Sequence, residues 1–300
     1  MTLSVVIITY NEENNIGRTL ESVKPLVGDG KGEIIVVDSG STDRTVEIAK
    51  SFGAKVFVEA WKGYAAQKNS AIEKATGDWI LSLDADEELE LALADEIALL
   101  LHPGGSDHVR QMNHLRKIGY AFRRQTHREA RQIAKREGMS DSFVVMISGY
   151  WIPRRNFFLQ RWIRHGGFWP DPKLRLFRRG SGEFRKSSVH ETVQVKSATG
   201  CLKHTIIHHS YPTLSDYIDH MNRYSSLAAE MIVAKGKVRF SVINIIVRPL
   251  ATFVYNYFFR LGFLDGREGL LLHLYHAVYV SWKYAKAWEV GSKASSGDPA

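Results

Sequence analysis

The feature that most constrains the fold is a regular alternation of short apolar runs with helical segments over the first 101 residues. The apolar runs, rich in β-branched residues, are Leu3–Thr9, Glu33–Val37, Ala54–Val58 and Trp79–Leu83. Between them, apolar side chains recur at helical spacing in residues 15–26, 42–52 and 64–75. Strands that alternate with helices predict βαβ units, and therefore an α/β fold with a mostly parallel sheet covered on both faces.

Three of the predicted strands run directly into polar loops. These loops read TYNEE after the first strand, DSGSTD after the second and DADEE after the fourth. In an open α/β sheet, ligands bind beyond the carboxyl ends of the strands. We therefore expect the three loops to form one site suited to a nucleotide, with Asp38 as an acceptor for a base or ribose.

The third loop carries two aspartates, Asp84 and Asp86, spaced two positions apart. If the strand continues through them, both point to the same face, because alternate residues of a strand do so. Their oxygens would suit Mg²⁺ or Mn²⁺ bridging a diphosphate. The alternative is a solvated strand end whose acids cap the following helix, which is predicted over Leu91–Leu101.

Other nucleotide-binding motifs do not occur in the chain. There is no G-x-x-x-x-G-K-[ST] sequence, and TYNEEN stands where a G-x-G-x-x-G would follow the first strand. These observations argue against a P-loop NTPase and against a dinucleotide-dependent dehydrogenase.

Beyond residue 101 the sequence changes character. Residues 107–137 carry nine Lys or Arg against three acidic residues, residues 143–195 read as strand-rich and aromatic, and helical spacing returns in residues 213–288. The expected organisation is a nucleotide-binding α/β half at 1–101, a basic insertion at 102–142, a strand-rich second half at 143–210, C-terminal helices at 211–290 and a disordered tail at 291–300. The insertion is either a solvated helical segment or a contact for an acidic surface.

The composition indicates which classes of partner the protein binds and in which cellular compartment it is expected. The net charge of +8 favours an acidic partner, such as a nucleotide, a phosphorylated glycan, an anionic membrane or nucleic acid. The single cysteine, Cys201, excludes an intrachain disulfide, and the N-terminus does not read as a signal peptide. Arg248 and Pro249 interrupt the apolar stretch at residues 240–259, so it is not expected to span a bilayer. We expect a cytoplasmic protein.

Five segments together carry a resemblance to a known family. They are SVVIITYNEENNIGRTLESV, IIVVDSGSTDRTVEIAKSFGAKV, QKNSAIEKATGDWILSLDADE, RWIRHGGFWPDPKLRLFRRG and VHETV. The chain resembles the inverting glycosyltransferases of family 2, which have the GT-A fold, and within them the lipopolysaccharide core enzymes of the heptose β-1,4-glucosyltransferase group. The resemblance implies transfer of a hexose, glucose from UDP-glucose, onto a lipopolysaccharide core or related envelope glycan.

The resemblance also implies functions for individual residues. The nucleotide would be held by Thr9, Tyr10, Asn11 and Glu12, by Asp38 at the base, and by Lys68 and Asp84 near ribose and phosphate. Asp86 matches the metal-binding acid of the D-x-D motif, for Mg²⁺ or Mn²⁺. Glu191 stands where the family has its catalytic base, although the family prefers aspartate, and His190 would orient Glu191 or touch the diphosphate. The alternative for Glu191 is an ion pair with a nearby arginine.

Aromatic and basic residues in the second half suggest acceptor contacts. Trp162 and Trp169 offer a face for a sugar, or belong to the core. Arginines suited to phosphate are Arg161, Arg164, Arg175, Arg178 and Arg179. His204, His208 and His209 have i, i+4 and i, i+5 spacing but no partner carboxylate motif, which argues against a zinc site, although His208 is a weak candidate near the donor metal. The C-terminal aromatic helices either lie on an anionic leaflet, at the inner face of the cytoplasmic membrane, or pack on protein.

The expected partners are therefore a nucleotide-sugar donor and a phosphorylated, lipid-linked glycan acceptor, with no nucleic acid. Three other functions remain open from the sequence. A polyprenyl-phosphate sugar synthase would use the same donor domain but a lipid phosphate acceptor. A sugar-phosphate nucleotidyltransferase would release pyrophosphate, and a non-catalytic basic module would bind membrane or nucleic acid.

Overall fold

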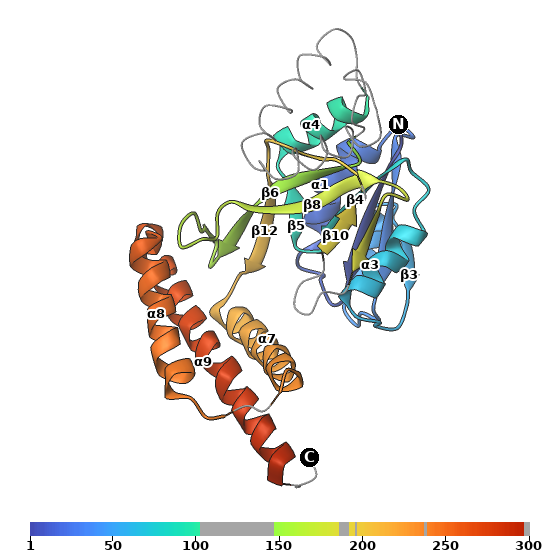
Figure 1. The fold of residues 1–300 in the computed structure, drawn as a ribbon. Coiled ribbons are helices and arrows are strands. Elements are labelled where there is room, and N and C mark those ends of the chain that lie inside the picture. Colours follow the sequence, from blue (N-terminus) through green and yellow to red (C-terminus); the bar gives the residue numbers. More distant parts are fainter. Residues whose placement is uncertain (103–146, 186–191, 196, 237–238, 297–300) are drawn as a thin grey trace, which may run out of the picture. The chain divides into compact units, whose positions relative to one another are not determined.

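The structure is a computed structural model that describes residues 1–102, 147–185, 192–195, 197–236 and 239–296 (Figure 1). The chain divides into two compact units. The first comprises residues 1–154, 172–187 and 191–207, and the second comprises residues 155–171, 188–190 and 208–300. Apart from His102, the expected basic insertion at 102–142 lies outside the described residues.

Most strands of the one large sheet belong to the first unit. In chain order the strands of this sheet are β1 (Leu3–Thr9), β2 (Gly32–Asp38), β3 (Lys55–Val58), β4 (Trp79–Asp84), β5 (Glu87–Leu89), β6 (Gly149–Phe158), β7 (Arg161–Trp162), β8 (Asp171–Arg178), β11 (Thr199–Cys201) and β12 (Ile206–Tyr211). The strand order is β3-β2-β1-β4-β8-β6-β12-β5, and β7 and β11 pair with β6. The first four strands in this order are parallel, and β8 is antiparallel to β4. This confirms the predicted α/β fold with a mostly parallel sheet. A separate two-stranded sheet pairs β9 (Gly182–Arg185) with β10 (Thr192–Val195).

Alternation along β1 explains why helices cover both faces of this sheet. Leu3, Val5 and Ile7 belong to one buried core, together with side chains of α1 (Ile16–Val27) and α4 (Leu91–Leu101). Val6 points the other way, into a core that includes side chains of α3 (Tyr64–Glu73). A strand that is apolar on both sides is expected in a parallel sheet buried on both faces. The short helix α2 (Thr45–Ser51) packs beside α1.

The second unit contains the C-terminal helices. These are α7 (Leu214–Ala234), the π-helical turn η1 (Ile243–Val247), α8 (Arg248–Val254), the π-helical turn η2 (Tyr255–Phe259), the 3-10 turn η3 (Gly262–Asp265) and α9 (Gly266–Ser296). The long helix α9 packs against both α7 and α8 (Figure 1). Among the described residues, no helix is long and apolar enough to cross a membrane.

A local hydrogen-bond motif explains where α7 begins. Thr213 and Asp216 form a reciprocal capping box that begins α7: the Thr213 hydroxyl accepts from the Asp216 N–H, and the Asp216 carboxylate accepts from the Thr213 N–H. At the C-terminal end of the same unit, helix α9 continues to Ser296. The helix therefore extends into the segment 291–300, for which the composition predicted disorder.

Candidate active site

The three polar loops expected to form the site lie at one edge of the sheet, after adjacent strands. In the register of the parallel pairs, Thr9 of β1 stands opposite Asp38 of β2, and Ile8 of β1 stands opposite Asp84 of β4. The carboxyl ends of these strands are therefore side by side. This is the edge at which open α/β sheets bind ligands.

The first two loops are joined by reciprocal hydrogen bonds. The Asn11 N–H donates to the Ser41 hydroxyl at 2.8 Å, and the Asn11 side-chain oxygen accepts from the Thr42 N–H at 2.8 Å. The Glu12 N–H donates to the Thr45 hydroxyl at 2.7 Å. Asn11 has a positive φ of 54°, a conformation that asparagine tolerates better than most residues. These contacts hold the first loop on the second.

Asp38 is fully buried and organises the turn that follows it. One of its carboxylate oxygens accepts from the Gly40 N–H at 2.9 Å and from the Ser41 N–H at 2.8 Å, and the other accepts from the Ser41 hydroxyl. Beside it, the hydroxyls of Thr9 and Ser39 are buried and have no hydrogen-bond partner among the residues that the structure describes. An unpaired buried hydroxyl costs free energy unless something else satisfies it. These two hydroxyls are therefore candidate contacts for a bound ligand.

A buried ionic network anchors the third loop. The Asp84 carboxylate pairs with Lys68 Nζ at 2.7 Å and with the Arg175 guanidinium. The same Arg175 nitrogen reaches Glu87 Oε1 at 2.7 Å, and Arg154 reaches that oxygen at 2.9 Å. Glu87 is fully buried, and Lys68 and Arg175 are nearly so. Two carboxylates and three cations are thus held together where β4 ends.

The charges in this network determine its ionisation. Burial opposes ionisation of Asp84, but the positive charges of Arg175 and Lys68 outweigh it and hold the pKa of Asp84 well below its usual range. Burial likewise opposes the charge of Arg175, while Asp84 and Glu87 raise the pKa of its guanidinium. Asp84 is therefore ionised and occupied by protein cations, which makes it a weaker candidate for direct metal binding than a carboxylate beyond the strand.

Asp86 lies in a turn, so the condition under which Asp84 and Asp86 would point to the same face of a strand is not met. Strand β4 ends at Asp84, residues 85 and 86 form a turn, and β5 begins at Glu87. The Glu87 side chain accepts from the Asp84 N–H at 3.0 Å, and the Thr19 hydroxyl donates to the Ala85 carbonyl oxygen at 2.7 Å. These two bonds fold the chain back, so strand alternation does not align Asp84 with Asp86.

Negative charge accumulates between the first and third loops. Burial raises the pKa of Glu12, and the carboxylates of Asp86, Asp43 and Asp84 raise it further, while a hydrogen bond from Asn15 acts in the opposite direction. Asp86 and Glu12, separated by 74 positions in the sequence, are thus close enough to interact electrostatically. Asp86 is half-buried at this edge of the sheet.

The arginines predicted to meet a phosphate have other contacts. Arg175 is buried in the ionic network, which corrects its expected place in the acceptor site. Arg179 donates to the Gly77 carbonyl oxygen at 2.9 Å, and Arg178 lies over the Trp79 ring. Arg161 pairs with Glu268 at 3.6 Å.

Trp162, His208 and His209 belong to the second unit, whereas His204 belongs to the first. The guanidinium carbons of Arg155 and Arg164 each lie 4.6 Å from the Trp162 ring centroid, and Trp169 meets Trp162 edge-on. This packing favours the structural interpretation of Trp162. The His208 Nδ1 lies 2.8 Å from the Asn156 side-chain oxygen, and His209 stacks on Phe157. Glu191 and His190 lie outside the described residues.

Sequence reasoning missed Glu87, Arg154 and the anchoring function of Arg175. Glu87 is one of two successive glutamates, and only its position after the turn makes it the buried one. Arg175 and Asp84 are separated by 91 positions in the sequence. No local pattern links such residues, although an arginine flanked by leucines in KLRLF indicates a partly buried cation that needs an acidic partner.

The mostly parallel sheet with helices on both faces is that of a transferase of the GT-A fold, and sequence comparison gives the family. The model of glycosyl transferase family 2 matches residues 4–182. The chain belongs to this family, and it is a glycosyltransferase.

Several relatives match nearly the whole chain, including an uncharacterized rickettsial glycosyltransferase and a lipopolysaccharide core enzyme. An uncharacterized glycosyltransferase of Rickettsia typhi is 30% identical and covers 97% of this chain and 88% of its own length. The lipopolysaccharide core biosynthesis glycosyltransferase LpsC of Rhizobium meliloti is 29% identical and covers 96% of this chain and 93% of its own. Among solved structures, glucosyl-3-phosphoglycerate synthase of Mycobacterium tuberculosis, in complex with Mn²⁺, UDP-glucose and phosphoglyceric acid, is 33% identical over 29% of this chain and 34% of that one, with a TM-score of 0.27.

Proposed function

We propose that this glycosyltransferase transfers a hexose, glucose from UDP-glucose, onto a lipopolysaccharide core or related cell-envelope glycan with inversion at the anomeric carbon. The observation that carries the donor half of the proposal is the edge formed by the loops after β1, β2 and β4, with its two unpaired buried hydroxyls. The likeness to LpsC over nearly the full chain supports the acceptor class.

The nucleotide would lie across the first two loops. Tyr10 is 57% exposed beside the Asp38 turn, so its ring is available to stack on a base. The hydroxyls of Thr9 and Ser39 would gain hydrogen bonds from the ligand, and Asn11 and Glu12 would line the same loop. Lys68 and Asp84 would stand near ribose and phosphate, where the Lys68 charge favours an anion.

Asp86 is the residue we propose for a divalent cation, Mg²⁺ or Mn²⁺. The charge accumulated between Glu12 and Asp86 fits a cation. Among the described residues, no three His, Cys, Asp or Glu side chains could hold a metal by themselves, so the remaining ligands would be donor phosphates and water, as is common for Mg²⁺. When bound, the metal would offset the charge on the departing diphosphate.

We propose Glu191 as the base that deprotonates the acceptor hydroxyl, with His190 orienting it. One positioned carboxylate is sufficient for direct displacement, because its pKa has only to allow proton transfer as the hydroxyl attacks. The acceptor would be phosphorylated and lipid-linked, so we propose that the protein acts at the inner face of the cytoplasmic membrane. A polyprenyl phosphate acceptor is distinguished by product analysis, since it would give a glycosyl phosphate instead of a glycoside.

The donor site is tested by thermal unfolding with UDP and UDP-glucose, each with and without Mn²⁺. A ligand at 100 times its dissociation constant stabilises the native state by about 2.7 kcal/mol, so we expect a rise in melting temperature of several degrees with UDP-glucose and Mn²⁺ together. The Asp86→Ala variant should lose the metal-dependent part of this rise and should lose transfer activity, because the metal would no longer be held against the phosphates of the donor.

The matched control is Asp95→Ala, which removes an exposed aspartate of α4 in the same unit. It should keep both the stabilisation and the transfer activity. Near-normal turnover in Asp86→Ala would contradict the metal assignment. If no nucleotide sugar stabilises the wild-type chain, the proposed donor class is wrong.

A further inference from the structure

The helical segment that contains η1, α8 and η2 exposes an unusual amount of apolar surface. The exposed side chains fall into two adjacent rows, each with a spacing of four residues: Val242, Ile246, Leu250, Val254 and Phe258 in one row, and Ile243, Val247, Ala251, Tyr255 and Phe259 in the other. Their larger members are between 36% and 76% exposed. We call this surface the apolar stripe. Contiguous exposed apolar surface of this extent marks a site of interaction.

The π-helical turns help to keep the stripe straight. A turn of α-helix holds 3.6 residues, so a row with a spacing of four drifts around the helix axis. The turns η1 and η2 are wider, with i→i+5 hydrogen bonding, and they reduce that drift. The two rows therefore continue along one side of the segment from Val242 to Phe259.

A helix whose outer face meets water has polar side chains on that face, whereas the outer face of this segment is apolar. Asn244, Thr252 and Asn256 are less exposed than the stripe and alternate with Ile245, Phe253 and Tyr257 on the side away from it. On that side the segment packs on α9, where the Ser281 hydroxyl donates to the Ile245 carbonyl oxygen at 2.8 Å. A water-exposed amphipathic helix has its apolar face toward the protein. Here the apolar rows face outward, which suits an apolar medium.

The charges near the stripe indicate which kind of partner it binds. No Asp or Glu occurs between Glu230 and Asp265. The exposed basic residues in this interval include Lys235, Arg239, Arg248 and Arg260. An apolar face bordered by cations and free of acids is complementary to an anionic lipid surface, where apolar side chains reach the acyl boundary and cations meet headgroups.

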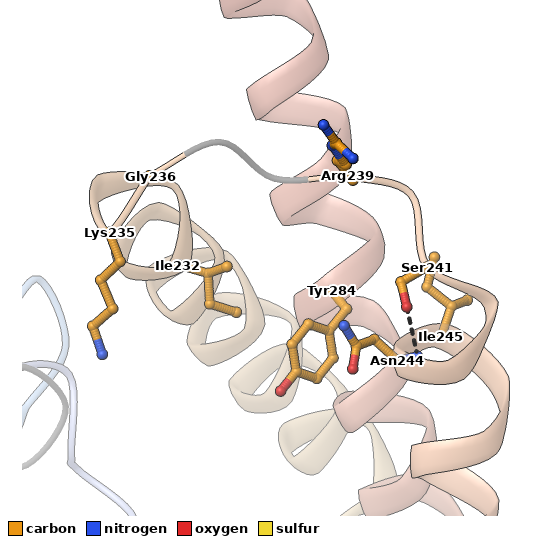
Figure 2. Close-up of a pocket in the computed structure, with 8 residues that line it drawn as sticks. All are labelled: Ile232, Lys235, Gly236, Arg239, Ser241, Asn244, Ile245 and Tyr284. Atoms are coloured by element: carbon orange, nitrogen blue, oxygen red, sulfur yellow. Dashed lines mark hydrogen bonds between the residues drawn. The ribbon is translucent and has the colours of Figure 1, made fainter.

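The basic residues do not converge on one small anion: Lys235 directly follows α7, Arg239 precedes η1, and Arg248 and Arg260 lie at the start of α8 and just after η2. An open pocket of about 530 Å³ lies between the end of α7, η1 and α9. Figure 2 shows Tyr284 and Asn244 close together in it, while Lys235 and Arg239 lie on opposite sides and do not point toward one another. Arg248 is held by the Tyr284 hydroxyl. This distribution fits an extended anionic surface better than a single bound phosphate.

We propose that the apolar stripe docks this protein on an anionic bilayer surface, with the segment Val242–Phe259 lying in the plane of the interface. The inference deepens the proposed function, because a lipid-linked acceptor would be met at that surface. It rests on different residues from the donor site, so either can fail alone.

The test is flotation of the full chain with vesicles of phosphatidylcholine, with and without phosphatidylglycerol. We expect the wild-type chain to float with the anionic vesicles and to be released by salt. Ile243→Ser combined with Phe259→Ser should lower the bound fraction at least ~10-fold, because two large apolar groups no longer enter the interface. Arg239→Gln should weaken binding about fivefold, the loss expected for one cation near an anionic surface.

The matched control combines Val58→Ser with Leu91→Ser, which removes two equally exposed apolar residues of the first unit. It should float like the wild type. The proposal is overturned if the wild-type chain stays unbound with anionic vesicles, whatever the variants do. It is also overturned if sedimentation shows a dimer that the stripe variant dissociates, since the occupant would then be a second copy. Stabilisation by UDP-glucose and Mn²⁺, measured on the same variants, scores the donor site separately.

Discussion

Replacing Arg175 with methionine is expected to lower the free energy of unfolding by about 3–5 kcal/mol, the usual cost of removing one partner from a buried ionic group. Arg175 contacts both Asp84 and Glu87 through one guanidinium nitrogen. Without it, Asp84 remains paired with Lys68, and Glu87 with Arg154. The methionine fills much of the volume, so the loss reports mainly the uncompensated charge.

Urea unfolding of the wild type and the variant measures this difference. The control is Arg44→Met, which also breaks an arginine–glutamate pair, but one whose side chains are mostly exposed. Such surface pairs contribute about 0–1 kcal/mol. If Arg175→Met costs no more than Arg44→Met, the buried network does not stabilise the fold as described. Because the network fixes the turn that carries Asp86, Arg175→Met should also lose the stabilisation by UDP-glucose and Mn²⁺.

Much of the α/β half could be predicted from the sequence because its strands are buried on both faces. Leu3–Thr9 was predicted with the bounds that β1 has, and Leu91–Leu101 with those of α4. Continuous apolar runs and helical spacing are local properties, so they indicate these elements without tertiary information. The gathering of the three loops followed from the rule for carboxyl ends of parallel strands.

The geometry of the site depended on contacts that no local pattern encodes. The sequence DADEE is equally compatible with a continued strand and with a turn. The hydrogen bond from the Asp84 N–H to the Glu87 side chain stabilises the turn. Glu87 is in turn held by Arg175, 88 positions away. Because its acidic partners are so far away in the sequence, Arg175 was expected to contact a phosphate. A basic residue in a polar, glycine-containing segment cannot be distinguished from a ligand contact until its acidic partners are known.

The second large effect expected concerns acid stability and arises from His273 in the second unit. His273 is 1% exposed, and within the described part of the chain neither ring nitrogen has a hydrogen-bond partner. Gly166 and Gly262 lie directly against its ring, where a Cβ at either position would come within 2.3 Å of it. Burial, together with a smaller effect of the nearby His276 and against the opposing effect of Asp265, lowers the pKa of His273 to about 4. Burial also lowers the pKa of His276.

The sign follows from which state binds the proton. Between pH 6.5 and about 4, His273 is neutral in the folded chain and protonated in the unfolded chain. The unfolded state then binds more protons, so the free energy of unfolding falls as the pH falls through this window, by about 3 kcal/mol for this group alone. Urea unfolding at pH 7 and pH 4.5 should show most of that loss in the wild type. His273→Leu, of similar volume, should show a clearly smaller loss, whereas His102→Leu, which removes an exposed histidine, should behave like the wild type. Equal losses in all three chains would mean that His273 is not held neutral by its surroundings.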